Sequence, residues 1–222
     1  MTDYRKLIAE FVGTFTLIFA GAGAIIASQG TNLVAIALAH GLSIAIMGSA
    51  LGHISGGVFN PSLTVGLWVT RRLRAMDAVA YMVAQLAGAV VAAAVLVAVF
   101  DVTLRNQVHL GTPMLGTGVT FTQGVVLEAL MTFFLMLAVF GTALDERGPK
   151  LGALLIGLTI TMDIAFAGTL TGASMNPART FGPALVSGTW TNHLVYWVGP
   201  IFGAVAAAIL YEFVFLEKEA AA

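Results

Sequence analysis

Two short motifs that could form a site stand in the two halves of the chain, Asn60-Pro61-Ser62 and Asn176-Pro177-Ala178-Arg179. Asn followed by Pro is typical of a helix start, because the Asn side chain accepts a hydrogen bond from a free backbone N–H and Pro fits the first helical position. Both motifs follow Gly-rich stretches inside apolar sequence. They predict two half-helices inside a membrane, at a pore or binding site near its midplane.

The two asparagines could donate amide N–H groups to one point of such a pore. A water molecule whose oxygen accepts both bonds turns its protons away, and this interrupts a continuous row of hydrogen-bonded waters. The positive ends of two half-helix dipoles, about half a charge each, would oppose cations at the same point. Arg179 would cost about 2.5–3.5 kcal/mol at a helix centre facing lipid, so we expect it to face water or a partner. The set predicts a passage for neutral molecules.

The elements that position these residues must be those of a membrane protein. The 222-residue chain is 59% hydrophobic and 9% charged, with a formal net charge of -1 and a mean hydropathy of +0.94, whereas soluble domains have about 25% charged residues. Alternating polarity typical of an outer-membrane barrel is absent. Six apolar runs approach the roughly 20 residues that cross a bilayer. They lie at 7–28, 33–52, 77–100, 120–143, 151–168 and 193–216.

Two glutamates within the apolar runs repeat with the same local sequence. Glu10 lies 50 residues before Asn60 and Glu128 lies 48 before Asn176, and each begins a Glu-x-x-x-Thr-Phe match. Proton carriage is one interpretation. Their repetition instead favours acceptors for backbone N–H groups of the loops that lead into the two motifs.

Segments 53–60 and 169–176 are too short to cross, and the apolar stretches after them are too short as well. Irregular backbone at membrane depth needs protein or a water-filled cavity beside it. We therefore expect an all-α membrane protein with six transmembrane helices and two re-entrant half-helices, built as an inverted repeat because each half has three spans. The predicted organisation is one channel domain, 1–222, with repeat 1 at about 4–101, an outer linker at 102–119 and repeat 2 at about 120–216.

Charge sets the expected orientation. Of ten Lys and Arg residues, eight fall on one side if six helices alternate, from Arg5 to Lys218, which leaves Arg105 and Arg179 for the other. The positive-inside rule then places both termini in the cytoplasm, with the cell (inner) membrane as the expected location. The chain has no Cys, which excludes disulfides and thiolate metal sites. We expect no metal, no cofactor, no nucleic-acid partner and no enzymatic activity.

The strings around both motifs resemble the aquaporins, or major intrinsic proteins, over essentially the whole chain. They are Gly52–Gly57, Gly172–Pro183 and Tyr196–Pro200, of which the last fits the water-channel branch. The resemblance implies one pore per protomer and a homotetramer. Ser62 departs from the usual Ala, and Val58 stands where the family often has His. Neither changes the expected mechanism, because residue 62 packs behind the Asn and residue 58 contributes mostly its carbonyl.

The resemblance also assigns the residues of the pore by their offsets from the two boxes. It implies a selectivity filter of His40, Ile164, Ala173 and Arg179. The expected lining carbonyls are those of Gly56, Gly57, Val58, Gly172, Ala173 and Ser174. The expected loop supports are Glu10 and Glu128, and His53 is expected in the inner vestibule.

His40 with Ile164 opposite resembles the filter of plant tonoplast aquaporins, whereas water-selective relatives usually carry Phe at the first position and His at the second. The expected function is a passive water channel that excludes protons and ions and also passes small neutral solutes such as ammonia. A glycerol facilitator is an alternative, although its filter is aromatic and has Asp where this chain has Thr180. A structural membrane protein without conduction is a further alternative.

An ion-coupled transporter is less favoured, because it needs a titrating group in the pathway and only Asp163 and His40 qualify. Asp163 is a costly intramembrane carboxylate that should have a partner. It either orients His40 or Arg179, or lies at a helix end near the outer surface without a role.

Overall fold

Six long apolar helices form the body of the protein, whose computed structural model describes residues 3–216. They are α1 (Tyr4–Ser28), α2 (Leu33–Ser55), α4 (Ala75–Val99), α6 (Phe121–Val139), α7 (Gly152–Thr171) and α9 (Val195–Leu210). α6 and α9 continue into π-helical turns, η2 (Phe140–Leu144) and η3 (Tyr211–Phe215). All six are long and apolar enough to span a membrane, which confirms the predicted number. Lys218, counted above for orientation, lies outside the described residues.

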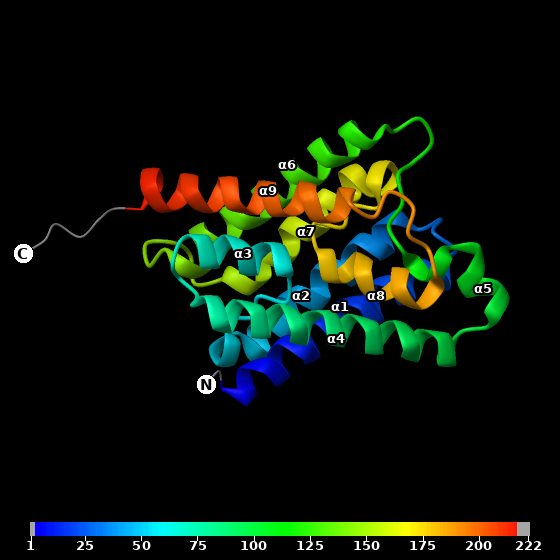
Figure 1. Cartoon of the computed structure of the whole chain (residues 1–222), viewed down its shortest axis with the longest axis horizontal. Helices are drawn as coiled ribbons and strands as arrows, with labels where there is room; N and C mark the ends of the chain where they lie inside the picture. The colour runs from blue at the N-terminus through cyan, green and yellow to red at the C-terminus, as the bar shows by residue number, and fades with distance from the viewer. Residues whose placement is uncertain (1–2, 217–222) are drawn as a thin grey trace, which may run out of the picture.

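Two shorter helices, α3 (Pro61–Val69) and α8 (Pro177–Ser187), lie inside this bundle. Both contact α4 and α9, and they extend from the middle of the molecule toward opposite ends (Figure 1). Asn60 and Asn176 are their N-caps, with Pro in the first turn of each. The predicted half-helices therefore form and begin at the predicted residues.

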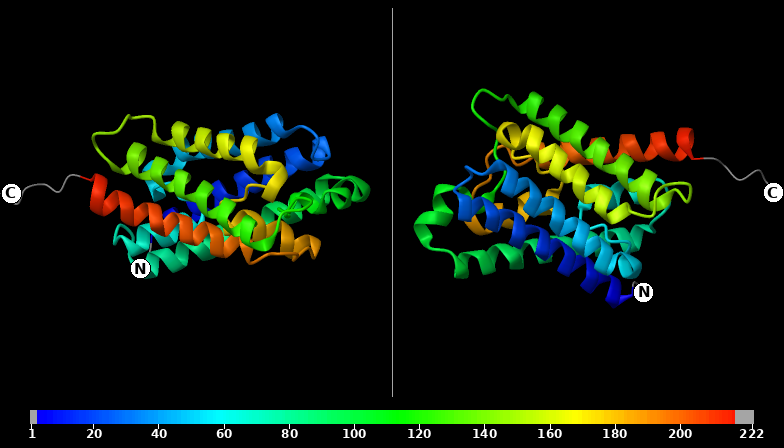
Figure 2. Two further views of the ribbon diagram at one scale, coloured as in Figure 1. Left: turned by 90° about the horizontal axis from the view of Figure 1, so that it is seen from above. Right: turned by 180° about the vertical axis from the view of Figure 1, so that it is seen from behind.

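The long helices pack in pairs, α1 with α4 and with α2, α2 with α7, and α6 with α9. The start of α1 and the end of η3 lie toward the same end of the molecule (Figure 2). Gly157 shows why small residues line the helix crossings: a Cβ there would lie 2.9 Å from the backbone nitrogen of Ala45 on α2. Such close backbone approach replaces the hydrophobic driving force that lipid does not supply.

Both re-entrant segments are shorter than the expected ranges 53–60 and 169–176. α2 and α7 each continue by about a turn, and they end at Gly56 and Gly172. These glycines have φ of 93° and 80°, which is the left-handed conformation that closes a helix and that side chains disfavour. Only five non-helical residues then remain before each half-helix.

The linker at 102–119 is only partly exposed. It forms α5 (Val102–Gln107) and a short 3-10 turn, η1 (His109–Gly111), and then enters the bundle. Leu110 is 2% exposed, and the backbone N–H of Gly116 donates to the carbonyl of Leu170 at 2.8 Å. Apolar burial and a backbone hydrogen bond thus hold the linker against the second half of the chain.

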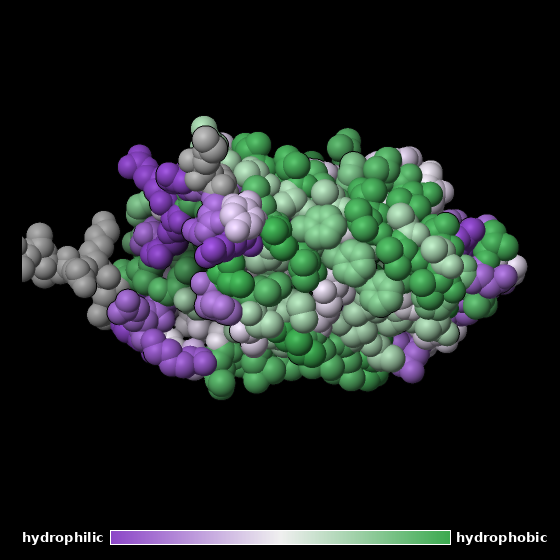
Figure 3. Space-filling model, turned by 90° about the horizontal axis from the view of Figure 1, so that it is seen from below, coloured by the Kyte–Doolittle hydropathy of each residue, from purple (hydrophilic) through white to green (hydrophobic). Residues whose placement is uncertain are grey.

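Charged side chains gather at the ends of the molecule, with an apolar band between them (Figure 3). At the end that carries the α6–α7 loop, Arg72 pairs with Glu212 at 2.6 Å and Arg147 pairs with Asp145 at 2.7 Å. Hydrogen bonds from Arg147 hold the pKa of Asp145 well below its usual range, so this pair stays ionised at neutral pH. The Arg72–Glu212 pair joins the α3–α4 loop to η3, and Arg147 joins the α6–α7 loop to η3 by donating to the Phe215 carbonyl at 2.7 Å.

Candidate functional site

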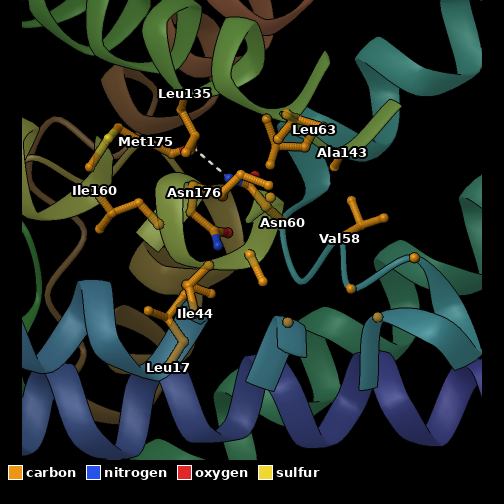
Figure 4. A pocket seen from close by; sticks show the side chains of 18 of the residues that line it. Leu17, Ile44, Val58, Asn60, Leu63, Leu135, Ala143, Ile160, Met175 and Asn176 are labelled. Atoms are coloured by element: carbon orange, nitrogen blue, oxygen red, sulfur yellow. Dashed lines mark hydrogen bonds between the residues drawn. The ribbon is translucent and has the colours of Figure 1, made fainter. Parts of the chain in front are cut away.

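The two half-helix starts meet through reciprocal hydrogen bonds. The Nδ2 group of Asn60 donates to the Met175 carbonyl at 2.9 Å (Figure 4). The Nδ2 group of Asn176 donates to the Phe59 carbonyl at 2.9 Å. Phe59 and Met175 have φ of 49° and 54°, which aims their carbonyls across the junction. Since each carboxamide carries two N–H bonds, one per Asn is left for another acceptor.

The carbonyl oxygens of the same side chains cap the half-helices. Asn60 Oδ1 accepts from the backbone N–H of Ser62 at 2.9 Å. Asn176 Oδ1 accepts from Ala178 at 3.0 Å and from Arg179 at 3.3 Å. Each carboxamide orientation is therefore fixed from both sides, and the positive ends of two helix dipoles point at one place.

Glu10 holds the first re-entrant segment. Its Oε1 accepts from the Ser55 hydroxyl at 2.6 Å and the Val58 N–H at 3.0 Å, and its Oε2 accepts from the Phe59 N–H at 2.7 Å. Gln85 on α4 donates to the same Oε2 at 2.7 Å. Sequence reasoning missed Gln85, because a single amide on an apolar helix carries no local sign of its partner.

Glu128 holds the second segment in the same way. Its Oε1 accepts from the Thr171 hydroxyl at 2.7 Å and the Ser174 N–H at 2.9 Å, and its Oε2 accepts from the Met175 N–H at 2.7 Å. Like Glu10, it is fully buried. The contacts match those of the first half bond for bond, although no second glutamine joins them among the described residues.

A cavity of about 520 Å³ runs past this junction, and both halves line it. Lining residues occur in pairs at equal offsets from Asn60 and Asn176, namely 20, 16, 12 and 3 residues before and 3 after. The pairs are His40 and Ile156, Ile44 and Ile160, Gly48 and Ile164, Gly57 and Ala173, and Leu63 and Arg179. The polar members of these pairs, His40 and Arg179, both belong to the four expected filter positions, whereas the residues paired with the four filter positions are all apolar.

Comparison with known proteins identifies the family. A family profile described as "Major intrinsic protein" matches residues 1–211. The chain belongs to this family. It is 40% identical to aquaporin TIP4-4 of maize, with 96% of this chain and 88% of the relative covered. It is also 40% identical to aquaporin AqpM of Methanothermobacter thermautotrophicus, with 94% and 96% covered. These relatives and the transmembrane cavity make this integral, multi-pass membrane protein a water channel.

A solved structure shows that the fold is also that of the family. The aquaglyceroporin from Plasmodium falciparum matches with a TM-score of 0.86, and the match covers 96% of each chain at 24% identity. At that identity the likeness concerns the helical architecture and says nothing of the solute.

In this major intrinsic protein, the linker holds Arg179, the arginine expected in the selectivity filter. Arg179 is 3% exposed, and its Nη1 donates to the carbonyl of Gly111 at 2.8 Å. Gly111 belongs to the left-handed turn of η1, with φ of 73°. Sequence reasoning missed this contact, because nothing in the linker sequence shows that it returns to the pore.

Other expected site residues are divided between the cavity wall and positions away from it. Gly56, Val58 and Ser174 line the cavity together with the residues paired above. Gly172 is not on the wall and instead ends α7. His53 is exposed in the last turn of α2 and is likewise not on the wall.

Asp163 is 2% exposed, and its Oδ2 has no hydrogen-bond partner among the described residues. The structure records no hydrogen bond from Asp163 to His40 or to Arg179 within residues 3–216. The contact that would let it orient either filter residue is therefore missing, and so is the exposure expected of a helix-end carboxylate.

The hydroxyl of Ser62, which departs from the family's usual Ala, is also unpartnered. Ser62 is fully buried and its Oγ makes no hydrogen bond within the described chain. We expect Ser62→Ala to raise the free energy of unfolding by about 1 kcal/mol, because it removes a buried polar group that lacks a partner. Unfolding in detergent micelles measures this change, and water permeability should not move. A less stable variant would show that the hydroxyl has a partner that supports the fold.

Proposed function

We propose that this channel conducts water passively, also passes ammonia, and excludes protons and ions. The observation that carries the proposal is the junction of the two N-caps on the cavity wall. Asn60 and Asn176 each keep one N–H for a passing molecule, and both lie at the positive end of a half-helix. A neutral molecule with an acceptor lone pair can be held there, whereas a cation meets an electrostatic barrier.

Proton exclusion follows from how a water would bind at the junction. Its oxygen accepts hydrogen bonds from the two carboxamides, so its own protons point toward the neighbouring waters on either side. A row of waters with such a centre cannot relay a proton through it. Gly56, Gly57, Val58, Ala173 and Ser174 line the cavity, and we expect their carbonyls to accept hydrogen bonds from those neighbouring waters.

Ammonia passage is supported by the composition of the filter. Ile164 and Ala173 present alkyl groups, and Arg179 supplies the charge. Ammonia is neutral, is close to water in size and has an acceptor lone pair, so an apolar wall with one donor penalises it little. Glycerol is larger and would need a wider filter, so the fold likeness to an aquaglyceroporin does not favour it.

Purified protein in liposomes tests both parts. We expect stopped-flow shrinkage faster than in empty vesicles, an internal alkalinisation on an ammonia gradient, and no proton leak. The double variant His40→Phe with Ile164→His installs the filter of water-selective relatives, and it should lower the ammonia-to-water permeability ratio. An ammonia-to-water permeability ratio that is unchanged in the double variant would contradict the proposal that this filter passes ammonia. Absence of water flux in the unmodified protein would overturn the channel itself.

We also propose that the channel is a homotetramer in the cell (inner) membrane, with both termini in the cytoplasm and two inverted repeats. The family resemblance supports the tetramer, and the excess of basic residues on one side supports the orientation. A channel of this family needs no catalytic group or cofactor. Native mass spectrometry would give the mass of four 23.0 kDa chains, and protease protection in inverted vesicles would report the side of the termini.

A further inference from the structure

The imidazole of His40 sits against Gly21, a position in the middle of α1 that has no side chain. A Cβ placed on Gly21 would lie 2.6 Å from Cε1 of His40 and closer still to Cδ2 and Nε2. Real Cβ atoms essentially never come within 3.0 Å of another heavy atom. The ring therefore occupies the volume that any other residue at 21 would fill.

The packing of the ring against Gly21, together with one hydrogen bond, accounts for its orientation. Nδ1 donates to the Ile36 carbonyl at 2.8 Å, because a carbonyl can only accept. Nε2 is then the unprotonated nitrogen, and it is buried without a partner among the described residues. The tip of the ring therefore lies over Gly21 of α1, while His40 still belongs to the cavity wall. One hydrogen bond and the free volume at Gly21 hold it there.

The second half of the chain offers an internal comparison. Gly21 and Val139 each follow the buried glutamate of their half by 11 residues, and His40 and Ile156 each precede the capping Asn by 20. Val139 and Ile156 both line the cavity. In the second half of the chain, two aliphatic side chains, Val139 and Ile156, occupy these two positions. In the first half, the imidazole ring of His40 is paired with Gly21, which has no side chain.

We propose that Gly21 is a positioning residue of the selectivity filter, which holds the His40 ring back from the lumen and thereby sets the opening for small neutral solutes. The inference rests on the water conduction proposed above. A side chain at 21 would displace the ring. Because Nδ1 is tethered to α2, the side from which the ring can leave α1 is the lumen.

The test compares four variants in liposomes at equal protein content. Gly21→Ala should lower water permeability at least about five-fold, because the ring narrows the pore. Gly21→Ala combined with His40→Ala should conduct like His40→Ala alone, since no ring remains to be displaced. Gly23→Ala is the matched control on the same helix, where a Cβ would lie 3.4 Å from Leu96 Cδ2, and it should leave permeability unchanged.

Each result bears on the proposal. Normal water flux in Gly21→Ala would overturn it, and so would a double variant that conducts no better than Gly21→Ala. If Gly21→Ala does not fold, the double variant decides, because a double variant that also fails to fold shows that something other than the ring excludes the Cβ. Absence of water flux in the unmodified protein would instead count against the proposed function.

Discussion

Replacing Glu128 by leucine is expected to release the second re-entrant segment and to abolish water conduction. The carboxylate accepts from the Thr171 hydroxyl and from the N–H groups of Ser174 and Met175, all of them buried. Each buried donor left without a partner costs about 1–3 kcal/mol. The total is comparable with the whole stability of many proteins, about 5–15 kcal/mol. Asn176 follows directly in the chain, so the junction loses its geometry as well.

Titration of the unfolding free energy in mixed micelles measures the stability, and stopped-flow shrinkage of liposomes measures conduction. Thr132→Val is a matched control one turn along α6, because within residues 3–216 its hydroxyl donates only to the Glu128 backbone carbonyl. It should cost about 0.6 kcal/mol, as polar contacts in membrane helices typically do. Glu128→Gln keeps one acceptor oxygen and should fall between the two. A Glu128→Leu protein as stable as the control would show that the segment does not depend on this carboxylate.

The parts of this architecture that sequence could predict are those with a local signal or an internal repeat. The Asn-Pro pairs fixed the starts of α3 and α8, and the runs of apolar residues gave the six spans. Glu10 and Glu128 could be assigned to the loops because duplication within the chain served as a second observation. α2 and α7 end about one turn later than predicted, because Gly56 and Gly172, rather than the change in polarity, end these helices.

The contacts that could not be predicted join segments far apart in the chain. Gly111 and Arg179 are separated by 68 residues. The packing of the His40 ring against Gly21 depends on how α1 and α2 cross. No periodicity records such pairs. For Asp163 the sequence indicated an energetically costly carboxylate inside the membrane but did not indicate its partner. In the structure its Oδ2 is buried and has no hydrogen-bond partner in the described chain. The sequence therefore predicts features with a local signal, but it does not predict which distant elements contact one another.

Removing the charge of Arg179 is expected to open the channel to protons and small cations. The side chain lies on the cavity wall, where it is one of the expected filter residues, and it is buried from bulk water. A unit charge about 5 Å away, at an effective dielectric constant of about 20, is repelled by about 3 kcal/mol, or roughly a hundred-fold in rate. Arg179→Val should therefore show a proton and sodium leak where the unmodified channel shows none. The half-helix dipoles remain, so the leak should stay below that of an open ion channel.

Two further variants separate charge from shape. Arg179→Lys keeps the charge but loses the planar group that bonds to Gly111, so it should still exclude protons even if water flux changes. Lys150→Gln removes a cation from the opposite end of the same cavity, beyond the start of α7, and should leave proton exclusion intact. A leak of equal size in all three would mean that any disturbance of the wall admits protons. If Arg179→Val shows no proton or sodium leak, the whole barrier to cations lies at the Asn60 and Asn176 junction. The two opposed half-helix starts would then be the source of positive potential that remains.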